Sequence, residues 1–307
     1  MYYRYMNLPG LFSFIVYAAE LIISPLQDNI NVPYASTVQA PVISFGQLIS
    51  QNSHSQNILG AESVPIPTPA PSLIFTPTPT PIPHVTRKPH MTIAMVGDSM
   101  IETLGSGVPD LQKKLVIYYP NTTFTILNNG VGSTTIDSGI NRLTKDYVVN
   151  AKKIPSVVSQ QPDLIIIESF AYNPYTLDEG ALTRHWLALA RIMDILREQL
   201  ADAKVLLSAT ITPNAKTFGD GAPYIAYTDI EKHEKVMTIK AFLDNTVRFA
   251  RSENIPLANA YNPSTMRDGN GNWTYISPTD HIHYSTKGRL FFIDTLFEAI
   301  VDNKLLE

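Results

Sequence analysis

The sequence predicts an α/β fold in which a mostly parallel β-sheet is covered by helices on both faces. From residue 90 onward, short apolar runs alternate with segments whose apolar residues recur every three or four positions. The runs themselves show no polar alternation, which is typical of strands buried on both sides. Strand and helix thus alternate along the chain, as they do in layered α/β domains.

Five apolar runs are the expected strands, and they occupy residues 91–96, 123–127, 164–167, 205–209 and, more weakly, 255–258. Three other segments carry the apolar stripe of a helix that buries one face. Their stripes consist of Leu182, Trp186, Leu189, Met193, Leu196 and Leu200, then Ile239, Leu243, Val247 and Ala250, and finally Leu290, Ile293, Phe297 and Ile300. We interpret them as packing surfaces rather than cofactor-binding segments. Ligands of such sheets bind beyond the carboxyl ends of the strands, so the chemistry is expected directly after each run.

The composition of the 307 residues narrows the classes of function. Hydrophobic residues make up 44% of the chain, which excludes a wholly disordered protein. Lys and Arg number 23 against 27 for Asp and Glu, and no long run of like charge occurs, so the basic face that nucleic acid requires is missing. The absence of cysteine excludes disulfides, thiolate metal sites and a cysteine nucleophile.

The first 26 residues have the features of an export segment. Arg4 precedes the apolar run 11–19, and no acidic residue occurs before Glu20. The run ends in small residues that suit a cleavage site, but apolar residues resume after Glu20, which suits a retained membrane anchor. We therefore expect residues 1–26 to be a signal peptide or an N-terminal anchor that leads to an extracellular or cell-surface location. A buried N-terminal helix of a cytosolic protein is the alternative.

A linker is expected between the export segment and the folded domain. Residues 27–64 show no sustained period, and nine of the 23 prolines fall within residues 65–89. Alternating Thr-Pro and Ile-Pro enters neither a sheet nor a helix interior, so this stretch predicts a semi-rigid polyproline II spacer. We expect residues 27–89 to be disordered and residues 90–307 to form the domain, held away from a membrane or cell wall. A proline-rich recognition ligand is the alternative.

The first strand is followed by Gly97, Asp98, Ser99 and Met100, which place a serine at a strand-to-helix turn. Backbone N–H groups at such a turn can stabilise an oxyanion that forms when the hydroxyl attacks a carbonyl. The alternative is structural, because Asp98 or Ser99 can also serve as a helix N-cap.

Two further post-strand segments carry small or amide side chains. Residues 128–135 contain Gly130 and Gly132, which allow a ligand to approach the backbone closely, although an ordinary Asn/Gly loop looks similar. Residues 168–174 contain Asn173, whose side-chain N–H can donate to a developing negative oxygen. A turn-forming asparagine before proline is the alternative.

The segment before the last helix contains Asp280, His281 and His283. A carboxylate three residues before an imidazole can hold its Nδ1–H, which leaves Nε2 of His283 free as a general base toward a serine. His281 competes for that role. Two histidines so close together also suggest a metal, but zinc needs a third ligand, and the other histidines occur singly. We therefore expect neither a metal nor a cofactor.

Taken in order, these four segments resemble the SGNH (GDSL-type) hydrolases over roughly residues 91–303. The resemblance implies a three-layer α/β/α flavodoxin-like fold with a serine nucleophile, a histidine base and an aspartate that orients the histidine. It also implies an oxyanion hole. Its donors are the backbone N–H of the serine, a backbone N–H of the second segment and an asparagine side chain of the third.

Carried over residue by residue, the resemblance makes Ser99 the nucleophile, His283 the base and Asp280 its partner. In the second segment the family's glycine falls on Gly132 or on Ser133, depending on the register.

The third segment departs from the family pattern, because Ala171-Tyr172-Asn173-Pro174 replaces Gly-x-Asn-Asp. An ungapped count from Pro162 puts Tyr172 at the asparagine position, and an offset of one residue restores Asn173 as the side-chain donor.

The sequence thus predicts an exported serine esterase that hydrolyses a small ester or an acetylated glycan, with O-acetyl groups on cell-surface glycans as the first candidate. Two alternatives stay open. An O-acetyltransferase to wall polysaccharide would use the same residues, with a sugar hydroxyl in place of water. A surface binding module with little catalytic activity would explain the altered third segment.

Overall fold

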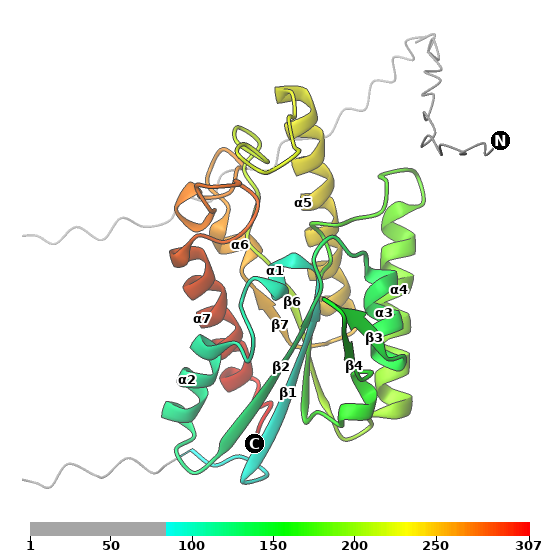
Figure 1. Ribbon diagram of the computed structural model, residues 1–307, viewed down its shortest axis with the longest axis vertical. Coiled ribbons are helices and arrows are strands. Elements are labelled where there is room, and N and C mark those ends of the chain that lie inside the picture. The colour runs from blue at the N-terminus through cyan, green and yellow to red at the C-terminus, as the bar shows by residue number, and fades with distance from the viewer. Residues whose placement is uncertain (1–83) are drawn as a thin grey trace, which may run out of the picture. The chain divides into compact units, whose positions relative to one another are not determined.

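A five-stranded, fully parallel sheet forms the centre of the domain (Figure 1). The computed structural model describes residues 84–307, so the predicted export segment 1–26 and the predicted linker up to residue 83 lie outside the described residues. Along the sheet the strand order is β2-β1-β5-β6-β7. The strands are β1 (His90–Gly97), β2 (Thr123–Gly130), β5 (Leu164–Glu168), β6 (Lys204–Ala209) and β7 (Leu257–Asn259).

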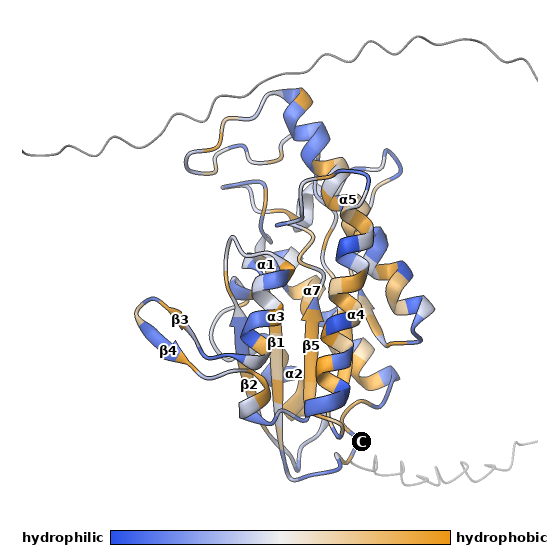
Figure 2. Ribbon diagram, turned by 90° about the vertical axis from the view of Figure 1, so that its right-hand side faces the viewer, coloured by the Kyte–Doolittle hydropathy of each residue, from blue (hydrophilic) through white to orange (hydrophobic). Residues whose placement is uncertain are grey.

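Helices cover both faces of the sheet, which confirms the predicted three-layer α/β arrangement. One face packs against α2 (Pro109–Tyr118) and α7 (Thr286–Asp302), and the other packs against α3 (Ile136–Thr144), α4 (Ala181–Gln199) and α5 (Asp229–Ser252). Figure 2 shows α3 and α4 in front of β1 and β5, whose residues are largely hydrophobic.

Alternation along β1 explains how one strand serves two cores. Ile93 and Met95 pack toward α2 and α7, whereas Ala94 and Val96 pack toward α3 and α4. Successive side chains of a strand point to opposite faces, so a strand between two helical layers needs apolar residues at every position. All five predicted strands are confirmed, with their ends shifted by up to three residues.

The three predicted helical stripes lie in α4, α5 and α7. Helix α5 begins ten residues before the stripe at Ile239, because the side chain of Thr228 accepts the N–H of Glu231 while Glu231 accepts the N–H of Thr228. This reciprocal cap satisfies N–H groups that the first turn of a helix leaves unpaired. It extends α5 beyond the body of the domain, as Figure 1 shows.

Several elements were not predicted from the sequence. They are α1 (Ser99–Glu102), α2, α3, the hairpin of β3 (Tyr147–Val149) and β4 (Lys152–Ile154), α6 (Tyr261–Ser264) and the 3₁₀ turns Val158–Gln160 and Trp273–Tyr275. Strand β2 also continues through Gly130, so the first three residues of the expected loop at 128–135 belong to the sheet. Within residues 84–307, no helix is both long and apolar enough to cross a membrane.

The end of the predicted linker is attached to the domain. The N–H of Arg87 donates to the carbonyl of Leu306, and the ammonium of Lys88 lies 2.6 Å from the carboxylate of Asp163. The folded domain therefore begins a few residues before the predicted boundary at residue 90.

Candidate active site

The turn between β1 and α1 presents Ser99 at the carboxyl end of the sheet. Asp98 is the N-cap of α1, and its Oδ1 accepts the N–H of Met100 at 2.8 Å. The capping alternative considered for this segment is therefore realised by Asp98, while Ser99 occupies the first helical position. A side chain at Gly97 would collide with Ile101 and Glu168, so the turn requires glycine there.

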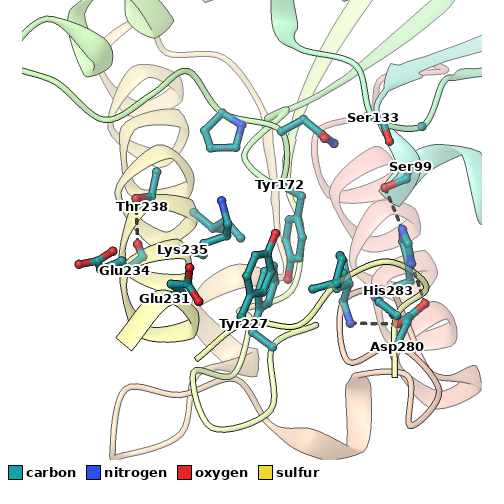
Figure 3. A pocket seen from close by; sticks show the side chains of 18 of the residues that line it. Ser99, Ser133, Tyr172, Tyr227, Glu231, Glu234, Lys235, Thr238, Asp280 and His283 are labelled. Carbon is teal, nitrogen blue, oxygen red and sulfur yellow. Dashed lines mark hydrogen bonds and ion pairs between the residues drawn. The ribbon is translucent and has the colours of Figure 1, made fainter. Parts of the chain in front are cut away.

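Ser99, His283 and Asp280 form one hydrogen-bonded chain (Figure 3). His283 Nε2 lies 2.9 Å from Ser99 Oγ, and His283 Nδ1 lies 2.8 Å from Asp280 Oδ2. The other carboxylate oxygen of Asp280 accepts the backbone N–H groups of Ile282 and His283. Residues 184 positions apart in the sequence are thus joined at one edge of the sheet, as the sequence predicts.

Hydrogen bonding keeps Asp280 ionised. Burial opposes its charge, but the bonds from the His283 ring and from the backbone N–H groups of Ile282 and His283 together hold the pKa of Asp280 below its ordinary value. An ionised Asp280 accepts the Nδ1–H of His283, which leaves Nε2 facing Ser99 as a proton acceptor.

The loop after β2 passes beside the nucleophile, and its hydrogen bonds differ for the two possible registers. The N–H of Gly132 donates to Glu102 Oε2 at 2.9 Å, so it is already paired. Among the described residues, the N–H groups of Ser99 and Ser133 have no acceptor. Ser133 has a φ of 57°, in the left-handed region where glycine is the usual residue. Of the two alternatives, the geometry therefore favours Ser133 as the backbone donor.

Gly130 serves the fold and not a ligand. A Cβ on this residue would lie 2.3 Å from the backbone nitrogen of Glu102, so glycine permits β2 to end against α1. From the sequence we expected Gly130 to allow a close approach of the backbone to a ligand. The close approach exists, but its partner is α1.

Asn173 and Tyr172 both line the cavity at Ser99, but their polar groups have different partners. Asn173 lines the same cavity as Ser99, and its Nδ2 donates to Asp98 Oδ2 at 2.9 Å. The hydroxyl of Tyr172 donates to the carbonyl of Ile211 at 2.9 Å. The offset of one residue therefore describes the third segment better than the ungapped count.

Two carboxyls next to the nucleophile turn are buried, which was not predicted from the sequence. Asp98 and Glu168 are both fully buried. Burial raises the pKa of Asp98, and burial together with the nearby charge of Asp98 raises the pKa of Glu168 well above its usual range. An acidic residue that ends an otherwise apolar strand was the available signal for Glu168.

His281 faces away from the nucleophile. Its Nδ1 lies 2.7 Å from the carbonyl of Asp220, and its backbone has a φ of 52°. His283 alone therefore contacts Ser99. Within residues 84–307, no group of three His, Asp or Glu side chains has the arrangement of a metal site.

The chain of Ser99, His283 and Asp280 opens into a cavity of about 990 Å³. Its other end is formed by the first turns of α5 and by the loop before them, as Figure 3 shows for Tyr227, Glu231, Glu234, Lys235 and Thr238. The rings of Phe218 and Tyr227 stack with centroids 6.3 Å apart, and Lys235 Nζ lies 5.2 Å from the centroid of Tyr227. The outer end of the cavity was not predicted from the sequence. The capping box of Thr228 and Glu231, which marks the start of α5, was the available signal.

No protein-family model and no curated protein matches this sequence. Among solved structures, a lipase/acylhydrolase from Enterococcus faecalis matches 69% of this chain and 96% of its own, with 16% identity and a TM-score of 0.50. A GDSL-like lipase from Bacteroides thetaiotaomicron matches 69% of this chain and 89% of its own, also with 16% identity and a TM-score of 0.50. These likenesses confirm the predicted fold, which this chain shares with GDSL-type proteins.

Proposed function

We propose that this protein is a serine hydrolase that cleaves carboxylic esters. The observation that carries the proposal is the hydrogen-bonded chain from Ser99 through His283 to Asp280, which opens into a cavity beside unpaired backbone N–H groups. Nucleophile, base and orienting carboxylate within hydrogen-bond reach are the combination that acyl transfer requires. The fold shared with a lipase/acylhydrolase and a GDSL-like lipase supports the same reaction.

The reaction begins when Ser99 Oγ bonds to the ester carbonyl carbon and its proton moves to His283 Nε2. The carbonyl oxygen becomes an oxyanion, which accepts hydrogen bonds from the N–H groups of Ser99 and Ser133 and from the Asn173 amide. When the C–O bond breaks, His283 returns the proton to the leaving alcohol. Water then attacks the acyl carbon while His283 accepts a proton from it. When the bond between the acyl carbon and Ser99 Oγ breaks, His283 returns that proton to Oγ and the carboxylic acid leaves.

A fluorophosphonate probe tests the nucleophile directly. It phosphonylates an activated serine, so we expect stoichiometric labelling of the wild type and none of Ser99→Ala. Ser252→Ala, which removes an exposed serine at the end of α5, serves as the matched control and should label like the wild type. Labelling of Ser99→Ala at the wild-type rate would refute the assignment of the nucleophile.

For the substrate, we propose an O-acetyl group carried by a glycan. An acetyl group fills only a small part of a 990 Å³ cavity, so most of the volume is left for the alcohol portion. The outer end combines the aromatic rings of Phe218 and Tyr227 with charged and hydroxyl groups of α5, which suits a sugar with apolar faces and hydroxyl edges better than a long acyl chain. The combination of aromatic rings and polar groups at the outer end of the cavity therefore supports a sugar as the alcohol portion of the substrate.

We also propose that the protein is exported and acts at the cell surface. Arg4, the apolar run 11–19 and the Thr/Pro-rich stretch from residue 65 support this proposal, and only the end of that stretch, from residue 84, lies within the described residues. Fractionation of the native host, followed by detection with an antibody to the domain, tests it. Recovery in the membrane, wall or medium is expected, and recovery only in the cytosol would contradict it.

A further inference from the structure

Arg142 is a buried cation without an ion pair. It lies on α3 with 3% of its surface exposed, and no carboxylate of the described residues lies within 4.0 Å of its guanidinium. Burying a charge without an ion pair is unfavourable, and Nε of this guanidinium also has no hydrogen-bond partner among the described residues. The nearest negative groups, Asp98 and Glu102, act on it only at longer range. Its placement therefore calls for an explanation beyond packing.

The guanidinium joins the two backbone segments that supply the proposed oxyanion donors. Arg142 Nη2 donates to the carbonyl of Gly97 at 2.8 Å, two residues before Ser99. Its Nη1 donates to Thr134 Oγ1 at 3.2 Å, one residue after Ser133. One rigid group thus holds the nucleophile turn and the loop after β2 at a fixed separation.

Neighbouring contacts make this link well defined. The N–H of Val131 donates to the same Gly97 carbonyl at 3.1 Å, and Thr134 Oγ1 donates to the carbonyl of Val131 at 2.6 Å. The ring centroids of Tyr147 and Phe170 lie 5.8 and 5.9 Å from Cζ of Arg142, and these rings restrict the orientation of the guanidinium plane. A planar group with several donors can make both links at once, whereas an ammonium has no such fixed fork.

We propose that Arg142 is a positioning residue for the oxyanion hole. It fixes the N–H groups of Ser99 and Ser133 relative to each other, and its positive charge, which has no ion pair within 4.0 Å among the described residues, favours the negative oxygen that forms beside them. The inference rests on the proposed ester hydrolysis. It predicts that loss of Arg142 weakens binding of the charged tetrahedral state far more than binding of the neutral substrate.

Kinetics of the full-length Arg142→Met and Arg142→Lys variants test the inference, with p-nitrophenyl acetate as substrate and a phenylboronic acid as the tetrahedral analogue. For Arg142→Met we expect kcat to fall about 100-fold while KM changes by less than about threefold, because only a donor arrangement used in the transition state is lost. The boronate inhibition constant should rise in parallel with the loss in kcat. Arg142→Lys should recover part of both.

A milder matched pair keeps the test decisive if Arg142→Met does not fold. Thr134→Val removes the link between Arg142 and the loop, whereas Ser138→Ala removes the 2.8 Å bond that Arg142 makes within its own helix. We expect Thr134→Val to lower kcat about tenfold and Ser138→Ala to leave it within about twofold of the wild type.

Folded Arg142→Met with wild-type kcat, or equal kinetics of Thr134→Val and Ser138→Ala, would overturn the inference. A loss of kcat without any change in boronate affinity would also overturn it, because the oxyanion hole would then still bind the tetrahedral analogue normally. If the wild type hydrolyses the ester, the proposed function stands and these results concern only the role of Arg142. Absence of hydrolysis by the wild type would overturn the proposed function, and the inference with it.

Discussion

Asp280 holds the base of this site in two ways within four residues. Its Oδ2 accepts the ring Nδ1–H of His283, and its Oδ1 accepts the backbone N–H groups of Ile282 and His283. The carboxylate is therefore fixed by the same short turn that it orients. A single side chain thus sets the tautomer, the ring angle and the direction of Nε2 toward Ser99.

Substitution of the two neighbouring histidines separates the base from its competitor. We expect His283→Ala to lower kcat for p-nitrophenyl acetate by at least about 10³-fold, because no other base contacts Ser99 Oγ. His281→Ala should reduce kcat only modestly, since His281 bonds to the carbonyl of Asp220. Steady-state kinetics of both variants decide the matter, and the reverse order would remove His283 from its role.

The register of the third segment is tested by a second neighbouring pair. Asn173→Ala should lower kcat by about 10²–10³-fold with little change in KM, because its amide acts on the oxyanion. Tyr172→Phe should keep kcat within about twofold and cost about 1 kcal/mol of unfolding free energy, because only the bond to the carbonyl of Ile211 is lost. Steady-state kinetics measure kcat and KM of both variants, and urea unfolding measures their free energies of unfolding. A large loss of kcat in Tyr172→Phe but not in Asn173→Ala would contradict the offset and place Tyr172 at the asparagine position of the family.

At the scale of elements, α4 carries a buried histidine that couples the third segment to α5. His185 is 1% exposed, its Nε2 lies 2.9 Å from the carbonyl of Ser169, and its Nδ1 lies 3.1 Å from Asn245 Nδ2 of α5. A neutral ring satisfies both contacts, as donor at Nε2 and acceptor at Nδ1. Burial lowers the pKa of His185 to about 4, although the Ser169 carbonyl partly opposes the shift.

This histidine makes folding stability depend on pH. Between an unfolded pKa of about 6.5 and the folded pKa of about 4, the unfolded chain binds a proton that the folded protein does not. Stability is therefore full above pH 6.5 and falls by about 3 kcal/mol as the pH drops to 4. Urea unfolding at several pH values should show that His185→Gln loses this part of the slope. An unchanged slope in the variant would contradict the assignment.

Helix α5 and the loop before it line the outer end of the cavity, where we propose that the alcohol portion of the glycan binds. Tyr227→Ala removes an aromatic wall of the cavity, so we expect kcat/KM for an acetylated oligosaccharide to fall about tenfold, while p-nitrophenyl acetate is affected less than about twofold. Tyr224→Ala changes a fully exposed residue of the same loop and serves as the control. Equal losses on both substrates, or none on the oligosaccharide, would exclude Tyr227 from a sugar subsite.

At the scale of the whole molecule, the sequence was most informative where one local rule determines the structure. Buried parallel strands must be apolar at every position, so all five strands were recognisable, and ligands gather at their carboxyl ends, so Ser99 and His283 could be expected together.

Features that depend on tertiary contacts were not predictable in the same way. Helices α2 and α3 are short, and neither was recognised from its apolar spacing. The choice between Gly132 and Ser133 depends on the position of the Glu102 carboxylate, which belongs to another element. Arg142 is likewise buried without an ion pair only because distant segments pack around it. The stacking of Phe218 on Tyr227 also depends on such packing.

The central claim is that Ser99 attacks an ester carbonyl, and the initial rate of p-nitrophenol release from p-nitrophenyl acetate by the purified full-length protein tests it most directly. We predict saturable hydrolysis by the wild type and a fall of about 10³-fold or more in Ser99→Ala of unchanged fold. No hydrolysis by a folded wild type, or equal rates for the two proteins, would contradict the claim. Absence of hydrolysis would favour a surface binding module built on the same fold, whereas equal hydrolysis by the two proteins would assign the reaction to another group.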